Sequence, residues 1–66
     1  MKLLVNGDRR DVADGATVAD LLNEMETPPS GVAVAVNGEV VPRVRWGRLP
    51  LTEGDRVEVL SAIGGG

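Results

Sequence analysis

The sequence has 66 residues, 42% of them hydrophobic and 26% charged, which is enough for one small domain that buries only about 60% of its unfolded surface. It contains no cysteine and no histidine, which excludes disulfides, thiolate metal sites, a cysteine nucleophile and the commonest general base. The net charge of −3 argues against nucleic-acid binding. No apolar run is long enough for a signal peptide or a membrane span. We therefore expect a soluble cytoplasmic protein that binds neither nucleic acid nor membrane.

The first predicted element is a β-hairpin. Residues 2–5 form its first strand, and Asn6-Gly7 favours a type I′ turn, in which both central residues have positive φ. The return strand is expected over residues 9–13. Its charged side chains suit an exposed edge of a sheet, because charge opposes pairing with another strand.

A short helix follows the hairpin. Thr17 is a suitable N-cap, and Asp20 stands three residues on, where the acid of a capping box would be. The spacing of one apolar helix face is met by Val18, Leu21, Leu22 and Met25. The helix must end by Thr27, since Pro28-Pro29 cannot continue it. A helix of two to three turns is unstable alone, so we expect it to lie on a sheet.

Two more strands are predicted next. Residues 32–36 alternate valine and alanine, so both faces are apolar and the strand should be central. Asn37-Gly38 repeats the turn chemistry of the first hairpin and leads to a short strand over residues 39–41, which Pro42 ends.

Residues 43–50 are expected to be irregular. Arg43, Arg45 and Arg48 surround Trp46, a combination that can bind nucleic acid by charge and stacking. With a single aromatic residue and an acidic chain, we favour a solvated loop whose tryptophan covers the edge of the core. After a turn at residues 53–55, the last strand is predicted over residues 56–62.

This order of elements predicts an α+β fold of the β-grasp (ubiquitin-like) type, with a mixed sheet of about five strands covered by one helix. Residues 1–63 should form the domain and residues 64–66 a flexible glycine tail. Because only one helix is present, one face of the sheet stays open, and that face must be either polar or a binding surface.

The glycine tail is the main candidate for function. A terminal glycine run is usually a frayed end or a linker. Here Gly64, Gly65 and Gly66 directly follow an apolar strand, and a narrow groove in a partner would require glycine. The only reactive group that the tail offers is the carboxylate of Gly66. Ser61 and Thr17 have no histidine to activate them, so we do not expect an enzyme.

The chain resembles the ubiquitin-like sulfur carriers, and among them the ThiS family. The resemblance covers the whole length. The segments that carry it are the helix start at residues 17–22, residues 36–43 with Trp46, residues 53–57, and Ile63 with the terminal Gly65-Gly66. Gly64 departs from the family pattern, which more often has a side chain there.

This resemblance implies a cycle centred on Gly66. An E1-like adenylating enzyme would use MgATP to activate its carboxylate, so the chain itself would hold no permanent cofactor and no metal. Sulfur from a donor such as a cysteine desulfurase would then give a thiocarboxylate, which donates sulfur to thiazole synthase in thiamine biosynthesis. Ile63, Gly64 and Gly65 would enter the partner's groove, and the free carrier would be a monomer.

A docking surface is expected around Leu60 and Ala62 on the open sheet face, with help from Ala33 or Ala35. Leu60 belongs equally well to the core, because the sequence does not fix which face of its strand points inward. Three other functions share the fold: a modifier joined to lysines by isopeptide bonds, the sulfur carrier subunit of molybdopterin synthase, and a β-grasp binding module with an inert tail.

Overall fold

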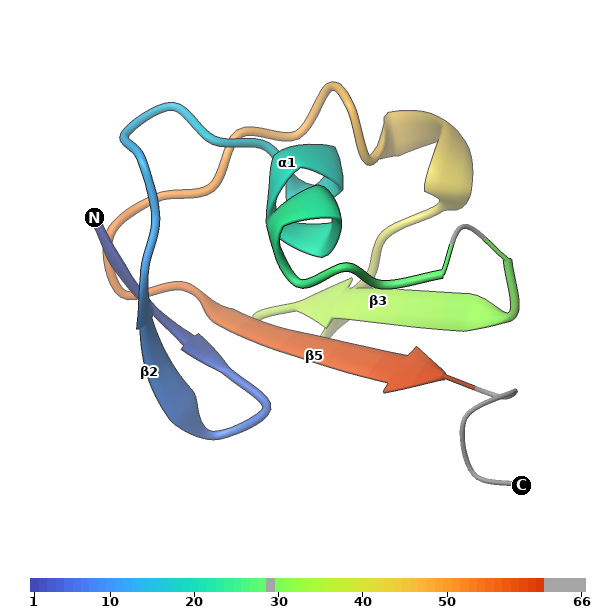
Figure 1. Ribbon diagram of the computed structural model, residues 1–66, viewed down its shortest axis with the longest axis horizontal. Helices are drawn as coiled ribbons and strands as arrows, with labels where there is room; N and C mark the ends of the chain where they lie inside the picture. Colours follow the sequence, from blue (N-terminus) through green and yellow to red (C-terminus); the bar gives the residue numbers. More distant parts are fainter. Residues whose placement is uncertain (29, 62–66) are drawn as a thin grey trace.

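The computed structural model describes residues 1–28 and 30–61. Five strands form one sheet in the order β2-β1-β5-β3-β4, and a single α-helix packs on one of its faces (Figure 1). The elements in chain order are β1 (Lys2–Val5), β2 (Asp8–Asp11), α1 (Val18–Glu24), β3 (Val32–Val36), β4 (Glu39–Val40), the 3₁₀ turn η1 (Arg43–Arg45) and β5 (Arg56–Ser61). The β1–β5 pair is parallel and the other three pairs are antiparallel, so the predicted mixed sheet of a β-grasp fold is confirmed.

Both Asn-Gly turns have the predicted geometry. Asn6 and Gly7 have φ values of 51° and 86°, and Asn37 and Gly38 have values of 51° and 85°. Positive φ at both central residues makes the type I′ twist that suits a two-residue hairpin. The two turns therefore fix the registers of β1 with β2 and of β3 with β4.

The predicted range of β2 was wrong at both ends. The tight turn places Asp8 opposite Val5 and Asp11 opposite Lys2, so the strand covers Asp8–Asp11 and not residues 9–13. After Asp11 the chain bends inward and buries Val12. The prediction of an exposed edge strand is confirmed, since β2 lies at one end of the sheet.

The N-terminus of α1 has the predicted capping box. Thr17 Oγ1 accepts a hydrogen bond from Asp20 N at 3.2 Å, and Thr17 N donates to Asp20 Oδ2 at 2.9 Å. The helix ends at Glu24 because Glu26 takes a left-handed conformation with φ of 55°, before the prolines are reached. The helix buries the first three residues of the predicted apolar stripe, while Met25 is only half-buried.

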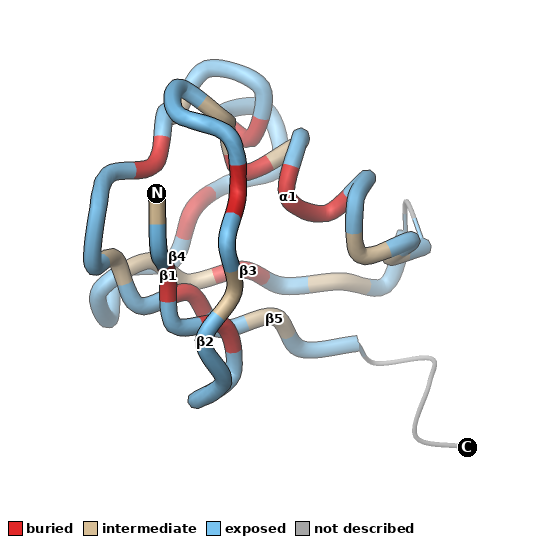
Figure 2. Tube along the Cα trace, turned by 60° about the vertical axis from the view of Figure 1, so that its left-hand side comes forward, coloured by how far each residue is buried: buried red, intermediate tan, exposed pale blue. Residues whose placement is uncertain are grey.

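The core lies between α1 and the sheet (Figure 2). It consists of Leu3, Val5, Val12, Val18, Leu21, Leu22, Val34, Val41, Trp46, Leu51 and Val57. Residues 43–50 are more regular than predicted, because Pro42 leads into η1. Trp46 is buried directly after η1 and its Nε1 donates to Val41 O at 2.9 Å, so the expectation that it covers the core is confirmed.

The middle position of the sheet belongs to β5 rather than to β3. β3 is an interior strand between β5 and β4, as its two apolar faces predicted. Its valines face α1, and Val34 is 1% exposed, whereas Ala33 and Ala35 point to the open face. The last strand was predicted to include Ala62, which lies outside the described residues.

Candidate functional site

The predicted tail, Ile63 to Gly66, and Ala62 before it lie outside the described residues. The structure describes the strand that leads to them. β5 ends at Ser61, five positions before Gly66. The geometry relevant to function is therefore that of β5 and of the open sheet face around it.

Leu60 lies on the open face of the sheet and not in the core. Side chains alternate along β5, so that Val57 points into the core at 1% exposure and Leu60 points outward at 67% exposure. In the antiparallel register, Leu60 stands opposite Ala33 on β3. The structure thus brings together Leu60 and Ala33, two of the residues predicted for docking, on one exposed surface.

Five apolar residues lie on this face, and we call them the apolar strip, although Arg56 and Glu58 of β5 stand between some of them. Its members come from four strands and are Leu4, Ala33, Ala35, Val40 and Leu60. The two alanines have small side chains, so the surface is low where they lie. Val40 is 77% exposed, and Leu4 lies on β1 at 37% exposure. Exposed hydrophobic residues that gather on one face mark a surface for protein contact. Of its members, Leu60 and Ala33 lie near the end of β5, whereas Leu4 stands opposite Arg56 at its start.

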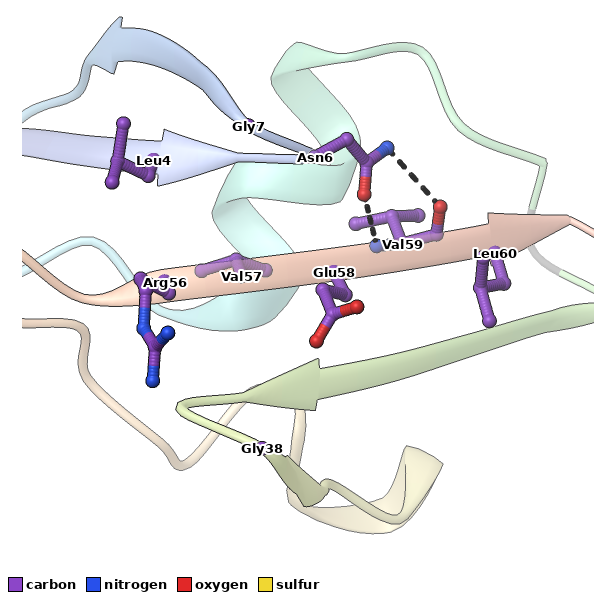
Figure 3. A pocket seen from close by; sticks show the side chains of 9 residues that line it. All are labelled: Leu4, Asn6, Gly7, Gly38, Arg56, Val57, Glu58, Val59 and Leu60. Atoms are coloured by element: carbon purple, nitrogen blue, oxygen red, sulfur yellow. Dashed lines mark hydrogen bonds between the residues drawn. The ribbon is translucent and has the colours of Figure 1, made fainter.

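A shallow groove of about 670 Å³ runs along β5 between the two Asn-Gly turns (Figure 3). Leu4, Asn6 and Gly7 form one wall, Gly38 lies at the opposite turn, and residues 56–60 of β5 form the floor. Arg56 and Glu58 add one charge of each sign to the apolar surface. The groove can therefore hold an extended, largely apolar segment of a partner that carries complementary charges.

The side chains of both turn asparagines bind the backbone of β5. Asn6 Oδ1 accepts from Val59 N at 2.8 Å, and Asn6 Nδ2 donates to Val59 O at 3.2 Å (Figure 3). Asn37 Oδ1 accepts from Arg56 N at 3.0 Å at the other end of the strand. The sequence analysis missed these contacts. The repeated Val-Asn-Gly-acid pattern, which covers residues 5–8 and 36–39, was the available signal, but we interpreted it only as turn chemistry used twice.

Asp55 stabilises the entry into β5. Partial burial acts to raise the pKa of its carboxyl group, but hydrogen bonds from the Thr52 backbone, from Asn37 Nδ2 and from Thr52 Oγ1 outweigh that effect, so the pKa lies below its usual range. The charged form of Asp55 is thus the one that holds the loop before β5 in place.

The basic segment does not have the geometry of a nucleic-acid site. Arg43, Arg45 and Arg48 are exposed, but Trp46 is buried and hydrogen-bonded, so its ring is not available for stacking on a base. Among residues 1–28 and 30–61, no group of three acidic side chains lies close enough together to hold a metal ion. No helix in this part of the chain is long and apolar enough to cross a membrane.

Comparison with known proteins agrees with the fold and identifies the family. The crystal structure of a thiamine biosynthesis protein (ThiS) from Geobacter metallireducens superimposes with a TM-score of 0.84 at 36% identity and with full coverage of both chains. The chain is therefore a ubiquitin-like β-grasp protein. The family model described as ThiS family matches residues 3–66. The chain belongs to the ThiS family.

Two similar sequences differ in how much of their length corresponds to this chain. The sulfur carrier protein ThiS of Escherichia coli is 33% identical over 66 residues, with full coverage of both proteins. A thiazole synthase of Paramagnetospirillum magneticum is 38% identical over the same 66 residues, but the chain spans only 20% of its length. The similarity to that thiazole synthase is thus confined to about a fifth of the enzyme.

Proposed function

We propose that this chain is a sulfur carrier in thiamine biosynthesis and that the carboxyl carbon of Gly66 carries the sulfur. The observation that carries the proposal is the family match, which extends to Gly66. The full-length similarity to a sulfur carrier protein supports it. The sequence also has no cysteine, so no thiol side chain is present to carry sulfur instead.

The chemistry that we propose begins with activation, because a carboxylate is a poor electrophile. An E1-like partner joins the Gly66 carboxylate to the α-phosphate of MgATP and releases pyrophosphate. The persulfide of a sulfur donor such as a cysteine desulfurase then attacks the acyl carbon, and a C–S bond forms while the C–O bond to AMP breaks. A thiol reductant supplies the two electrons that cleave the S–S bond to the donor, which leaves the thiocarboxylate on Gly66. ATP and Mg²⁺ belong to the partner, whose cations must offset the repulsion between a carboxylate and a triphosphate.

Thiazole synthase is the acceptor that we propose for this sulfur. The support comes from the thiazole synthases of Paramagnetospirillum magneticum and Magnetococcus marinus, which are 38% and 39% identical to this chain over 66 residues. In each of them the similar region makes up 20% of the protein. A ThiS-like region within a thiazole synthase is expected if the two act on each other.

Docking is proposed to occur through the apolar strip, with Leu60 as its main contact; Ala62, which we also expect to take part, lies outside the described residues. Ordering the three glycines 64–66 in a partner costs about 3–6 kcal/mol at about 1–2 kcal/mol for each residue. Contacts elsewhere must offset this cost. The exposed side chain of Leu60 lies six residues before Gly66, on the face that α1 leaves open.

Intact-mass measurement tests the proposal. The chain is incubated with a purified E1-like adenylating enzyme, MgATP and a sulfur source, and a chain that lacks Gly65-Gly66 is the control. We expect a mass gain equal to the replacement of one oxygen by sulfur, only in the full chain. Adducts on lysines would instead indicate a protein modifier, and an unchanged mass would contradict both functions. Sulfur transfer to a molybdopterin precursor but not to thiazole synthase would contradict the thiamine assignment.

A further inference from the structure

The two Val-Asn-Gly-acid segments lie on opposite sides of β5 at the same residue. In the parallel β1–β5 pair, Val5 stands opposite Val57, and in the antiparallel β3–β5 pair, Val36 stands opposite the same Val57. Each chain segment then turns away from β5 at its Asn-Gly pair. The repeated sequence thus places one asparagine on each side of the central strand.

The two asparagines hold opposite ends of β5. Asn37 acts at the incoming end, where its main chain and side chain together bind both backbone groups of Arg56: Asn37 N donates to Arg56 O at 2.7 Å, and Asn37 Oδ1 accepts from Arg56 N at 3.0 Å. Asn6 acts at the outgoing end. Asn6 N donates to Val57 O at 2.9 Å, and its side chain then binds both backbone groups of Val59.

The Asn6 side chain extends the β1–β5 ladder beyond the end of β1. Its carboxamide presents an acceptor and a donor to Val59, as the peptide group of one more strand residue would. Val59 lies two residues before Ser61, the last residue of β5, and directly before Leu60. On its other side this part of β5 is paired with β3, where Leu60 stands opposite Ala33. The outgoing end of β5 is therefore held from both sides.

We propose that Asn6 is a positioning residue for the tail: by holding Val59 it fixes the direction in which the chain leaves β5 while Leu60 is docked. This inference rests on the proposed function, because it concerns the delivery of Gly66 to an adenylating partner. Both hydrogen bonds to Val59 are solvent-exposed, so their contribution to global stability is small. These hydrogen bonds instead restrict the conformations of the last residues of β5. Without them, the partner would have to order these residues on binding, at a cost in conformational entropy.

The test compares Asn6→Gly with Asn37→Gly. Each variant deletes two side-chain hydrogen bonds of an Asn-Gly turn with a φ of 51°, and glycine tolerates that conformation. The variants are thus matched in the number of hydrogen bonds lost and in the turn that they alter, and they differ in the end of β5 that they release. Asn37→Gly also removes a donor to the Asp55 carboxylate. The readouts are the melting temperature, hydrogen exchange of the Val59 amide, and kcat and KM for adenylation by the E1-like enzyme.

We expect Asn6→Gly to lower kcat/KM for adenylation about tenfold, the factor that corresponds to about 1.4 kcal/mol, and to speed exchange at Val59. For Asn37→Gly, kcat/KM for adenylation should stay within about twofold of the wild-type value, even if its melting temperature falls as far as that of Asn6→Gly. Asn6→Asp keeps the acceptor for Val59 N and loses the donor to Val59 O, so it should fall between Asn6→Gly and the wild type. It also serves as the test if Asn6→Gly does not fold.

Equal losses of kcat/KM in Asn6→Gly and Asn37→Gly would overturn the positioning role and leave the carrier function standing. Unchanged exchange at Val59 in Asn6→Gly would overturn it without reference to any partner. A wild-type chain that the adenylating enzyme does not activate would contradict the proposed function itself, and the inference with it.

Discussion

Replacing Leu60 with alanine should weaken binding to the adenylating enzyme while leaving the domain intact. Full burial of a leucine side chain stabilises by about 1.5–3 kcal/mol, and Leu60 has 67% of its surface still exposed. A partner that covers it completely would gain about 1–2 kcal/mol from this residue, so Leu60→Ala should raise Kd by up to about 5- to 30-fold. Because Leu60 contributes little to the core, the free energy of unfolding should change by less than about 0.5 kcal/mol.

Val44→Ala provides a matched control. Val44 is 83% exposed and lies in η1, which is on the α1 side of the sheet, away from the apolar strip (Figure 1). Isothermal titration of each variant with the adenylating enzyme, together with thermal melts, separates affinity from stability. If Leu60→Ala and Val44→Ala bind equally well, the open face is not the docking surface and the reasoning from burial is refuted.

Three further predictions concern the domain itself. Trp46→Phe removes the donor to the buried carbonyl of Val41 and should cost about 1–3 kcal/mol in a denaturant titration; a loss below about 0.3 kcal/mol would mean that water replaces the indole. Thr17→Ala removes the N-cap acceptor of Asp20 N and should cost about 1 kcal/mol, which lowers the melting temperature by about 4–8 °C, whereas Thr17→Ser should melt like the wild type. The hydrogen-bonded carboxylate of Asp55 contributes stability that is fully present above its unfolded pKa of about 4 and is lost as the pH falls through its lower folded pKa. Melts from pH 7 to pH 2 should therefore show a shallower acid loss for Asp55→Asn, and an unchanged slope would argue against this contribution.

The features that the sequence predicted correctly depend on neighbouring residues. Asn6-Gly7 and Asn37-Gly38 determine their turns through their own backbone preferences. Thr17 caps a helix that begins at the next residue, and its bonds to Asp20 span only three positions. In such cases the residues that cause a structure and the residues that adopt it are a few positions apart. A single sequence is therefore enough to predict the turn or the helix cap.

The features that could not be predicted depend on distant pairing. Leu60 faces outward because it stands opposite Ala33, and that register is set across 27 positions of the chain. Asn6 reaches Val59 across 53 positions, so its second role is invisible in the local pattern. The exact ends of β2 follow from the length of β1. The residue types of the candidate site could therefore be predicted from local sequence, whereas the face on which they lie is known only from the structure.

The central place of β5 has a consequence for synthesis. The hairpins β1–β2 and β3–β4 are made first, but in the sheet they are joined only through β5. A nascent chain that stops before residue 56 contains the residues of both hairpins and of α1, yet it lacks the strand that unites them into one core. Closing a sheet across such long separations is also the slow part of folding. β5 ends five positions before Gly66, so a chain that stops before β5 lacks both the strand that completes the sheet and the proposed sulfur-carrying residue.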